Sequence, residues 1–124
     1  MGEELYDIEL EPAVEAWLDT LSDRDHAAVE AAVERLAEFG DRMPYGHARD
    51  LGDGLWELRF DIAHHSVRLT YWLAEDRRAV LLTAFYKTRD RQPRDVERAR
   101  KAMAECMSGG SEHGVAHRIY EGRG

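Results

Sequence analysis

Three cationic side chains lie on or directly after apolar runs within residues 55–87, LWELRFDIAHHSVRLTYWLAEDRRAVLLTAFYK. They are Arg59, Arg68 and Lys87. A charged side chain on an otherwise apolar strand is costly to bury, so it usually faces solvent or an anion. If the three runs form neighbouring strands, their cations could converge on one ligand. Phosphate is the best candidate, because Arg offers a planar fork of donors and Lys a compact charge.

Histidines offer a second kind of chemistry, because the free side chain titrates near neutral pH. His64 and His65 are adjacent in a polar connection, and His47 precedes the first apolar run. Each could transfer a proton, although a histidine in a loop is more often simply exposed. The six histidines show no metal-ligand spacing and Cys106 is the single cysteine. We therefore expect no metal, no cofactor and no internal disulfide, and an ordinary helical role for Cys106.

Length and composition indicate one soluble globular domain. The chain has 124 residues, of which 44% are hydrophobic and 34% charged. No apolar run reaches the roughly 18 residues of a transmembrane helix. The N-terminus, MGEELYDIEL, lacks the basic region and apolar core of a signal peptide. We therefore expect a cytoplasmic protein with no membrane partner.

Acidic and basic side chains are distributed unevenly along the chain. The formal net charge is −8, which does not favour a nucleic-acid binder. Residues 1–41 carry 13 acidic and 2 basic side chains, a net of −11, whereas residues 42–106 carry 10 acidic and 13 basic side chains, a net of +3. An acidic helical face is most often just solvated, but it would also direct an anionic ligand to the opposite side of the molecule.

The apolar periodicity indicates which elements must position these residues. Alternation predicts strands at residues 4–10, 55–60, 67–73 and 79–86, a short strand at 47–51, and a polar connection at 61–66. Helical spacing predicts a helix that opens at Pro12, a second from Ser22 to Gly40, and a third that opens at Pro93. We expect Trp56 and Trp72 to pack on the sheet rather than to stack on bases.

This order of elements predicts an α+β fold. Two N-terminal helices would pack on a small curled antiparallel sheet, followed by a C-terminal helix, with the helices on one side of the sheet. The folded domain would span residues 1–106. Residues 107–124 contain 5 glycines among 18 residues and no periodic apolar pattern, so we expect a flexible tail there.

Several segments together resemble a known family. The stretches LGDGLWELRF, SVRLTYW and VLLTAFYKTRDRQP, followed by a helix that starts DVERARK, resemble the RelE/HigB superfamily of toxin–antitoxin toxins. The phage-derived HigB-like (Gp49-like) branch is the most similar. The resemblance runs from about residue 11 to residue 105 and implies a RelE/ParE-like fold.

The resemblance also implies an activity and partners. Such a protein would be the toxin of a type II toxin–antitoxin system, an mRNA interferase that enters the ribosome and cleaves mRNA there, which inhibits translation. A cognate helix-turn-helix antitoxin would neutralise it, and the toxin would contact DNA only through that antitoxin. The functional cations of the family would fall on Arg59, Arg68 and Lys87. Further RNA contacts would fall on Arg89, Tyr86 and His65. Toxins of this type are usually basic, whereas this chain is acidic.

The implied reaction is attack of the ribose 2′-oxygen on the adjacent phosphate, which needs neither a protein nucleophile nor a metal. Arg68 would stabilise the transition state, Arg59 would be a second phosphate ligand, and Lys87 would act as a clamp or, with a lowered pKa, as a base. Each residue has a plainer alternative. Arg68 could pair with Glu57 across the hairpin, Arg59 could form a cross-strand ion pair, and Lys87 could be a solvated residue at a strand end.

Two other functions fit the same resemblance. A relative on this fold could poison DNA gyrase by protein contact without cleaving RNA, because fold alone does not decide function. The acidic N-terminal third is also compatible with an inactive relative that only binds its partner.

Overall fold

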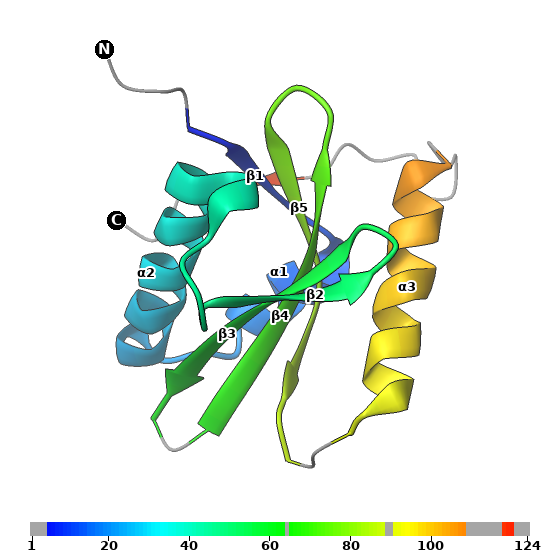
Figure 1. Ribbon diagram of the computed structural model, residues 1–124. Coiled ribbons are helices and arrows are strands. Elements are labelled where there is room, and N and C mark those ends of the chain that lie inside the picture. Colours follow the sequence, from blue (N-terminus) through cyan, green and yellow to red (C-terminus); the bar gives the residue numbers. More distant parts are fainter. Residues whose placement is uncertain (1–4, 64, 89–90, 109–117, 121–124) are drawn as a thin grey trace.

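The computed structural model describes residues 5–63, 65–88, 91–108 and 118–120 of the chain, which form an α+β fold (Figure 1). The elements in chain order are β1 (Asp7–Leu10), α1 (Pro12–Leu18), α2 (Asp23–Phe39), the 3-10 helix η1 (Gly40–Arg42), β2 (Ala48–Gly52), β3 (Leu55–Ile62), β4 (His65–Ala74), β5 (Arg78–Tyr86), α3 (Pro93–Met107) and β6 (Arg118–Ile119). The predicted fold class is therefore confirmed. Within these described segments, no helix combines the length and apolar character needed to cross a membrane.

The sheet is mixed and larger than the small antiparallel sheet that the sequence predicts. In the described residues the strand order is β2-β3-β4-β5-β1-β6. The strands β2, β3, β4 and β5 pair antiparallel with one another in that order. β1 instead pairs parallel with β5, with Ile8 opposite Ala79 and Leu10 opposite Leu81. The prediction was wrong here because β1 and β5 are far apart in the sequence, and local alternation contains no signal for such pairing.

The helices lie on both faces of the sheet, so the prediction of helices on one side was also wrong. Figure 1 shows α2 and α3 flanking the sheet. On the face covered by α1 and α2, the core contains Val14, Val29, Val33, Leu36, Leu58, Val67, Leu69, Tyr71 and Leu81. On the face covered by α3, a second core contains Leu55, Val80, Leu82, Ala99 and Met103. The strands are apolar on both faces for this reason.

The two ends of α2 follow the sequence prediction. Ser22 is the N-cap, and its hydroxyl accepts a hydrogen bond from the backbone N–H of Asp25. Gly40 ends the helix with a φ of 52°, a conformation that favours glycine. The space that a side chain at Gly40 would need is filled by the ring of Tyr6. The backbone N–H of Tyr6 donates to the carbonyl of Ala37, which ties the start of the sheet to the end of α2.

The hairpin between β3 and β4 is tighter than the predicted polar connection at 61–66. Asp61 pairs with Ser66 and Ile62 pairs with His65, so most of that segment is strand. Ala63 has a φ of 47°, in the left-handed region that short hairpin turns use. The sequence pattern did not predict these strand ends, because their residues are mostly polar and backbone hydrogen bonding between strands does not require apolar side chains.

The predicted flexible tail contains one strand. Arg118 and Ile119 pair antiparallel with β1, and the backbone N–H of Tyr120 donates to the carbonyl of Ile8. Residues 118–120 are therefore held at the edge of the sheet. A strand of two residues is too short to produce an alternating pattern. The proposed domain limit at residue 106 stays a prediction.

Candidate phosphate-binding site

Two arginines face each other on the side of the sheet that α3 covers. Arg59 of β3 is the direct partner of Arg68 of β4. Directly paired residues of antiparallel strands point to the same face. Burial, followed by the charge of Arg59, lowers the pKa of Arg68 from its ordinary value. The two predicted phosphate ligands are therefore close together, and the charge of each acts on the other.

Arg68 is held from two directions. Its Nε lies 3.8 Å from Oε1 of Glu57, and its Nη1 donates to the carbonyl of Val67 at 3.1 Å. Both charged residues are buried, with 6% of Glu57 and 9% of Arg68 exposed. The charges of Glu57 and then Asp61 raise the pKa of Arg68, against the effects of burial and Arg59. The pairing of Arg68 with Glu57 is therefore confirmed, but Arg68 is buried and is not the surface arginine that this alternative assumed.

Arg59 has a different environment. Its cross-strand partner is Arg68, rather than the acid that a simple cross-strand ion pair would need. Its Nε is buried and has no hydrogen-bond partner among the described residues. A buried, unsatisfied donor on a cation is unfavourable, and binding an anion would relieve it.

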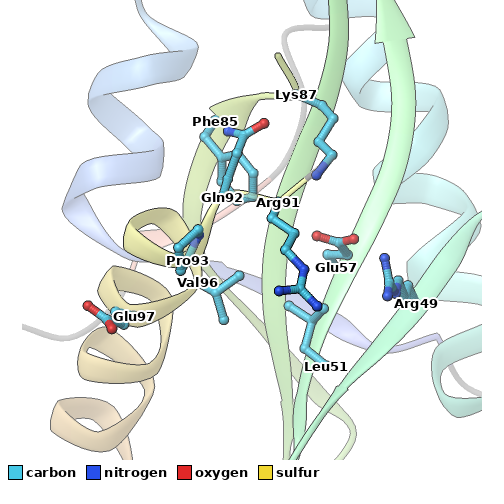
Figure 2. Close-up of a pocket in the computed structure, with 10 residues that line it drawn as sticks. All are labelled: Arg49, Leu51, Glu57, Phe85, Lys87, Arg91, Gln92, Pro93, Val96 and Glu97. Carbon is cyan, nitrogen blue, oxygen red and sulfur yellow. The ribbon is translucent and has the colours of Figure 1, made fainter. Parts of the chain in front are cut away.

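A pocket of about 430 Å³ opens beside these arginines, between the sheet and the start of α3 (Figure 2). The lining residues are Arg49, Leu51, Glu57, Phe85, Lys87, Arg91, Gln92, Pro93, Val96 and Glu97. In Figure 2, Lys87 and Arg91 lie on one side of Glu57 and Arg49 on the other. Two of the lining residues are neighbours of Arg68: Glu57, which forms the ion pair, and Phe85, the cross-strand partner of Arg68 on β5. We call Arg49, Arg59, Arg68, Lys87 and Arg91 together the cationic face.

A β-bulge brings Lys87 to this face. Trp72 pairs with Val80 and Tyr71 with Leu81, but Thr70 pairs with Thr83, so Leu82 is an extra residue in β5. Strict alternation from Val80 would place Lys87 on the opposite side of the sheet from the pocket. The extra residue reverses the facing of the strand beyond it, as bulges do. Lys87 then lines the pocket, and its backbone N–H donates to the carbonyl of Ser66 at 2.7 Å.

Two cations of the site were missed by the sequence prediction. Arg49 pairs with Glu57 across β2 and β3 and therefore shares its face. The alternation of Arg49 with Leu51 was the available signal, but the register of that short strand was not predicted. Arg91 lies between β5 and α3, in the segment KTRDRQP, where no periodicity tells which way a side chain points.

Gln92 fixes the segment that carries Arg91. Its Oε1 accepts from the backbone N–H of Thr88 at 2.7 Å. Its Nε2 donates to the carbonyl of Tyr86 at 3.1 Å and to Oδ2 of Asp95 at 2.8 Å. These contacts join the end of β5 to the first turn of α3 and so hold the segment that carries Arg91.

The chain matches a known family over most of its length. Residues 16–104 match the family model described as Phage derived protein Gp49-like (DUF891). The chain belongs to the phage-derived Gp49-like family. This is a RelE/HigB-like toxin-type family, associated with the toxins of toxin–antitoxin systems. No curated protein matches the chain significantly.

Two predicted RNA contacts of the Gp49-like protein lie away from the cationic face. Tyr86 pairs with Val67, so its side chain is on the side of α1, where its hydroxyl accepts from Nε1 of Trp17 at 3.3 Å. The rings of His65 and Tyr86 are 5.1 Å apart, so these two residues lie together. The structure therefore does not bring them to Arg59, Arg68 and Lys87. Arg89, the third predicted contact, lies outside the described residues.

The other aromatic and histidine candidates of the Gp49-like protein are mostly involved in packing. Trp56 stacks on Tyr71 with ring centroids 6.5 Å apart, and Trp72 packs against the core under α3, as predicted. Nδ1 of His47 lies 3.3 Å from Nη1 of Arg35 on α2. His64 lies outside the described residues.

Cys106 of the Gp49-like protein is poorly suited to nucleophilic chemistry. Burial, followed by the nearby Glu11, raises the pKa of its thiol to about 12. A thiol with this pKa is protonated near neutral pH and is a weak nucleophile. The predicted ordinary role of this helix residue agrees with these contacts.

Proposed function

We propose that this Gp49-like protein is the toxin of a type II toxin–antitoxin system that inhibits translation by cleaving mRNA on the ribosome. The observation that carries the proposal is the cationic face beside the pocket, where a buried donor of Arg59 has no partner among the described residues. The toxin-type family of the chain supports the same function. The cognate helix-turn-helix antitoxin would be its partner, and contact with DNA would occur through that antitoxin.

The cleavage would need a site that holds a phosphate and water that exchanges protons with it. The ribose 2′-oxygen attacks the adjacent phosphorus and its proton passes to water; the bond to the 5′-oxygen breaks and that oxygen takes a proton from water, so a cyclic phosphate and a free 5′-hydroxyl result. Arg59 and Arg68 would stabilise the additional negative charge of the transition state, with about 3 kcal/mol from each well-placed donor. Lys87, which lines the pocket, would clamp the RNA backbone. The protein supplies no nucleophile in this scheme.

The acidic net charge is compatible with this function because of where the acids lie. Seven of the 13 acidic residues in 1–41 belong to α1, α2 and η1. The cationic face lies on the other side of the sheet, beside α3. The acidic residues of α1, α2 and η1 would therefore repel an RNA strand from their face of the sheet and direct it to the pocket beside α3.

Mapping of mRNA ends in a translating extract tests the proposal. A defined mRNA is translated with wild-type protein, Arg59→Ala or Arg24→Ala, and new 5′ ends are located by primer extension. Arg24 is an exposed arginine of α2 and serves as the matched control. We expect codon-phased cuts with wild type and Arg24→Ala, and at least about a hundredfold fewer with Arg59→Ala.

The other functions give different outcomes in the same extract. If the mRNA stays intact and DNA incubated with gyrase acquires double-strand breaks, the protein is a gyrase poison and not a nuclease. Normal translation with intact RNA and DNA would identify an inactive relative. Equal cutting by wild type and Arg59→Ala would exclude the cationic face as the site of cleavage.

A further inference from the structure

We propose that Glu57 is a positioning residue that orients Arg68 for the reaction and, through its charge, restrains the binding of anions to the cationic face. The orienting part rests on the proposed function, because it is measured as RNA cleavage. The restraint on anion binding is independent of cleavage.

Glu57 lies at the centre of the cationic face. Arg49 of β2 pairs with it, Arg68 contacts it from β4, and its side chain lines the same pocket as Lys87 and Arg91. Only 6% of the surface of Glu57 is exposed to solvent. A buried carboxylate is unfavourable unless cations or hydrogen-bond donors compensate it. Its position among cations therefore stabilises both the carboxylate and the crowded arginines.

The neighbouring strand does not offer Glu57 a competing partner. Thr70 is its direct cross-strand partner on β4. The Thr70 hydroxyl is engaged by Thr83, with the two side-chain oxygens 2.7 Å apart and the Thr83 backbone N–H donating at 3.0 Å. On β4, the carboxylate of Glu57 therefore contacts Arg68, which reaches it diagonally across the hairpin.

The contact with Glu57 determines the place of Arg68 rather than its charge. Burial and Arg59 lower the pKa of Arg68, but an arginine stays protonated near neutral pH in any protein environment. Glu57 holds Nε and the Val67 carbonyl holds Nη1. These two contacts restrict the orientations that the guanidinium can adopt beside Arg59. An arginine has many rotamers, so without Glu57 this orientation would be one of several.

The same carboxylate opposes the ligand. A negative charge beside Arg68 and Arg49 repels an approaching phosphate and already neutralises part of the cationic face. Removal of the charge should therefore strengthen anion binding while it weakens the orientation of Arg68. A residue with a purely structural role would not produce these opposite effects on binding and cleavage.

Two substitutions separate charge from position. Glu57→Gln removes the charge and keeps the size, whereas Glu57→Asp keeps the charge and withdraws it from Arg68 by one methylene group. Glu34→Gln, on the exposed side of α2, is the control for the same change in net charge. Affinity is measured with a 2′-O-methylated RNA trinucleotide, which cannot be cleaved because its nucleophile is blocked. Cleavage is measured by primer extension in the translating extract.

We expect Glu57→Gln to bind the trinucleotide about threefold to tenfold more tightly and to cleave about tenfold to a hundredfold more slowly. Glu57→Asp should bind like wild type and cleave more slowly, and Glu34→Gln should match wild type in both assays. If Glu57→Gln does not fold, Glu57→Asp tests the orienting role. Slower cleavage by Glu57→Asp with unchanged affinity supports this role, and cleavage by Glu57→Asp at the wild-type rate overturns it. No gain in affinity for a folded Glu57→Gln overturns the restraint.

Failure of the inference can be distinguished from failure of the proposed function. If wild type leaves mRNA intact but Glu57→Gln gains affinity, the nuclease function is refuted and the restraint by Glu57 stands. If wild type cleaves and Glu57→Gln cleaves equally fast, the nuclease stands and the orienting role of Glu57 is refuted.

Discussion

Arg59 and Arg68 are direct cross-strand partners with their side chains on one face of the sheet, although both carry a positive charge. Like charges at such a pair destabilise a sheet by about 0.2–1 kcal/mol. The pKa of Arg68 is lowered by burial and then by Arg59, which shows the same repulsion. A phosphate between the two guanidinium groups would reverse the sign of this interaction. The phosphate site proposed above would therefore give this unfavourable pair a function.

The first prediction follows from this pair. Arg59→Ala removes the repulsion and the unsatisfied Nε, so the free energy of unfolding should stay unchanged or rise by about 0.2–1 kcal/mol. Inorganic phosphate should stabilise the wild type against urea, because it binds the folded state, and should stabilise Arg59→Ala much less. Urea unfolding with and without phosphate at constant ionic strength measures both effects, with Arg24→Ala as control. An equal phosphate effect on both proteins would remove Arg59 from the binding site.

The second prediction concerns Lys87 as a clamp for the RNA backbone. Its backbone hydrogen bond to Ser66 does not depend on the side chain, so Lys87→Ala should fold normally. Each phosphate contact to single-stranded RNA contributes about 0.7 to the slope of log affinity against log salt. Loss of Lys87 should reduce the slope by about that amount. Lys101→Ala, at an exposed position of α3, is the matched control and should leave the slope unchanged. A wild-type slope in Lys87→Ala would show that Lys87 contacts no phosphate.

Local patterns in the sequence predicted that Arg59 and Arg68 lie on neighbouring strands and could converge, but could not predict the whole site. Alternation identified the two strands, and the register that makes the arginines direct partners comes from the structure. Lys87 depends on the bulge at Leu82, which no alternation of apolar residues reveals in a strand that is buried on both faces. Arg91 lies in irregular backbone, where the direction of a side chain is decided by Gln92 and α3.

Two adjacent residues of an extended strand cannot both contribute side chains to one face of a sheet, and the predicted RNA site did not take this into account. Tyr86 and Lys87 follow each other at the end of β5, so their side chains must point to opposite faces. Both were assigned to one RNA site from the resemblance, and the structure separates them. The parallel pairing of β1 with β5 was missed for a different reason: it joins segments that are distant in the sequence, and no local pattern indicates such pairing. Sequence patterns are therefore informative within a hairpin and weak beyond it.

The third prediction concerns the end of α2. An alanine at Gly40 would need a positive φ and would overlap the ring of Tyr6, so both backbone strain and steric overlap oppose it. Gly40→Ala should lower the free energy of unfolding by about 2–4 kcal/mol, measured by urea titration. Gly54 also has a positive φ, of 88°, but faces open space. Gly54→Ala should therefore lose only about 1 kcal/mol. Equal losses in the two variants would mean that contact with Tyr6 contributes nothing.

The fourth prediction uses the thiol of Cys106. Burial, followed by Glu11, raises its pKa from 9.0 to about 12 in the folded state. Because the unfolded thiol ionises more easily, it stabilises folding fully below about pH 9, and this contribution is lost as the pH rises through about 12. Burial also raises the pKa of Tyr71, so the core under α2 loses stability in the same alkaline direction.

Cys106→Ala isolates the contribution of the thiol, since Tyr71 is present in both proteins. Between about pH 9 and pH 12, the urea midpoint should fall less steeply for Cys106→Ala than for wild type. At neutral pH the two proteins should differ only by the packing of the sulfur atom. Parallel pH profiles would mean that the thiol ionises equally in the folded and unfolded states, and that its environment between α3 and Glu11 is open to water.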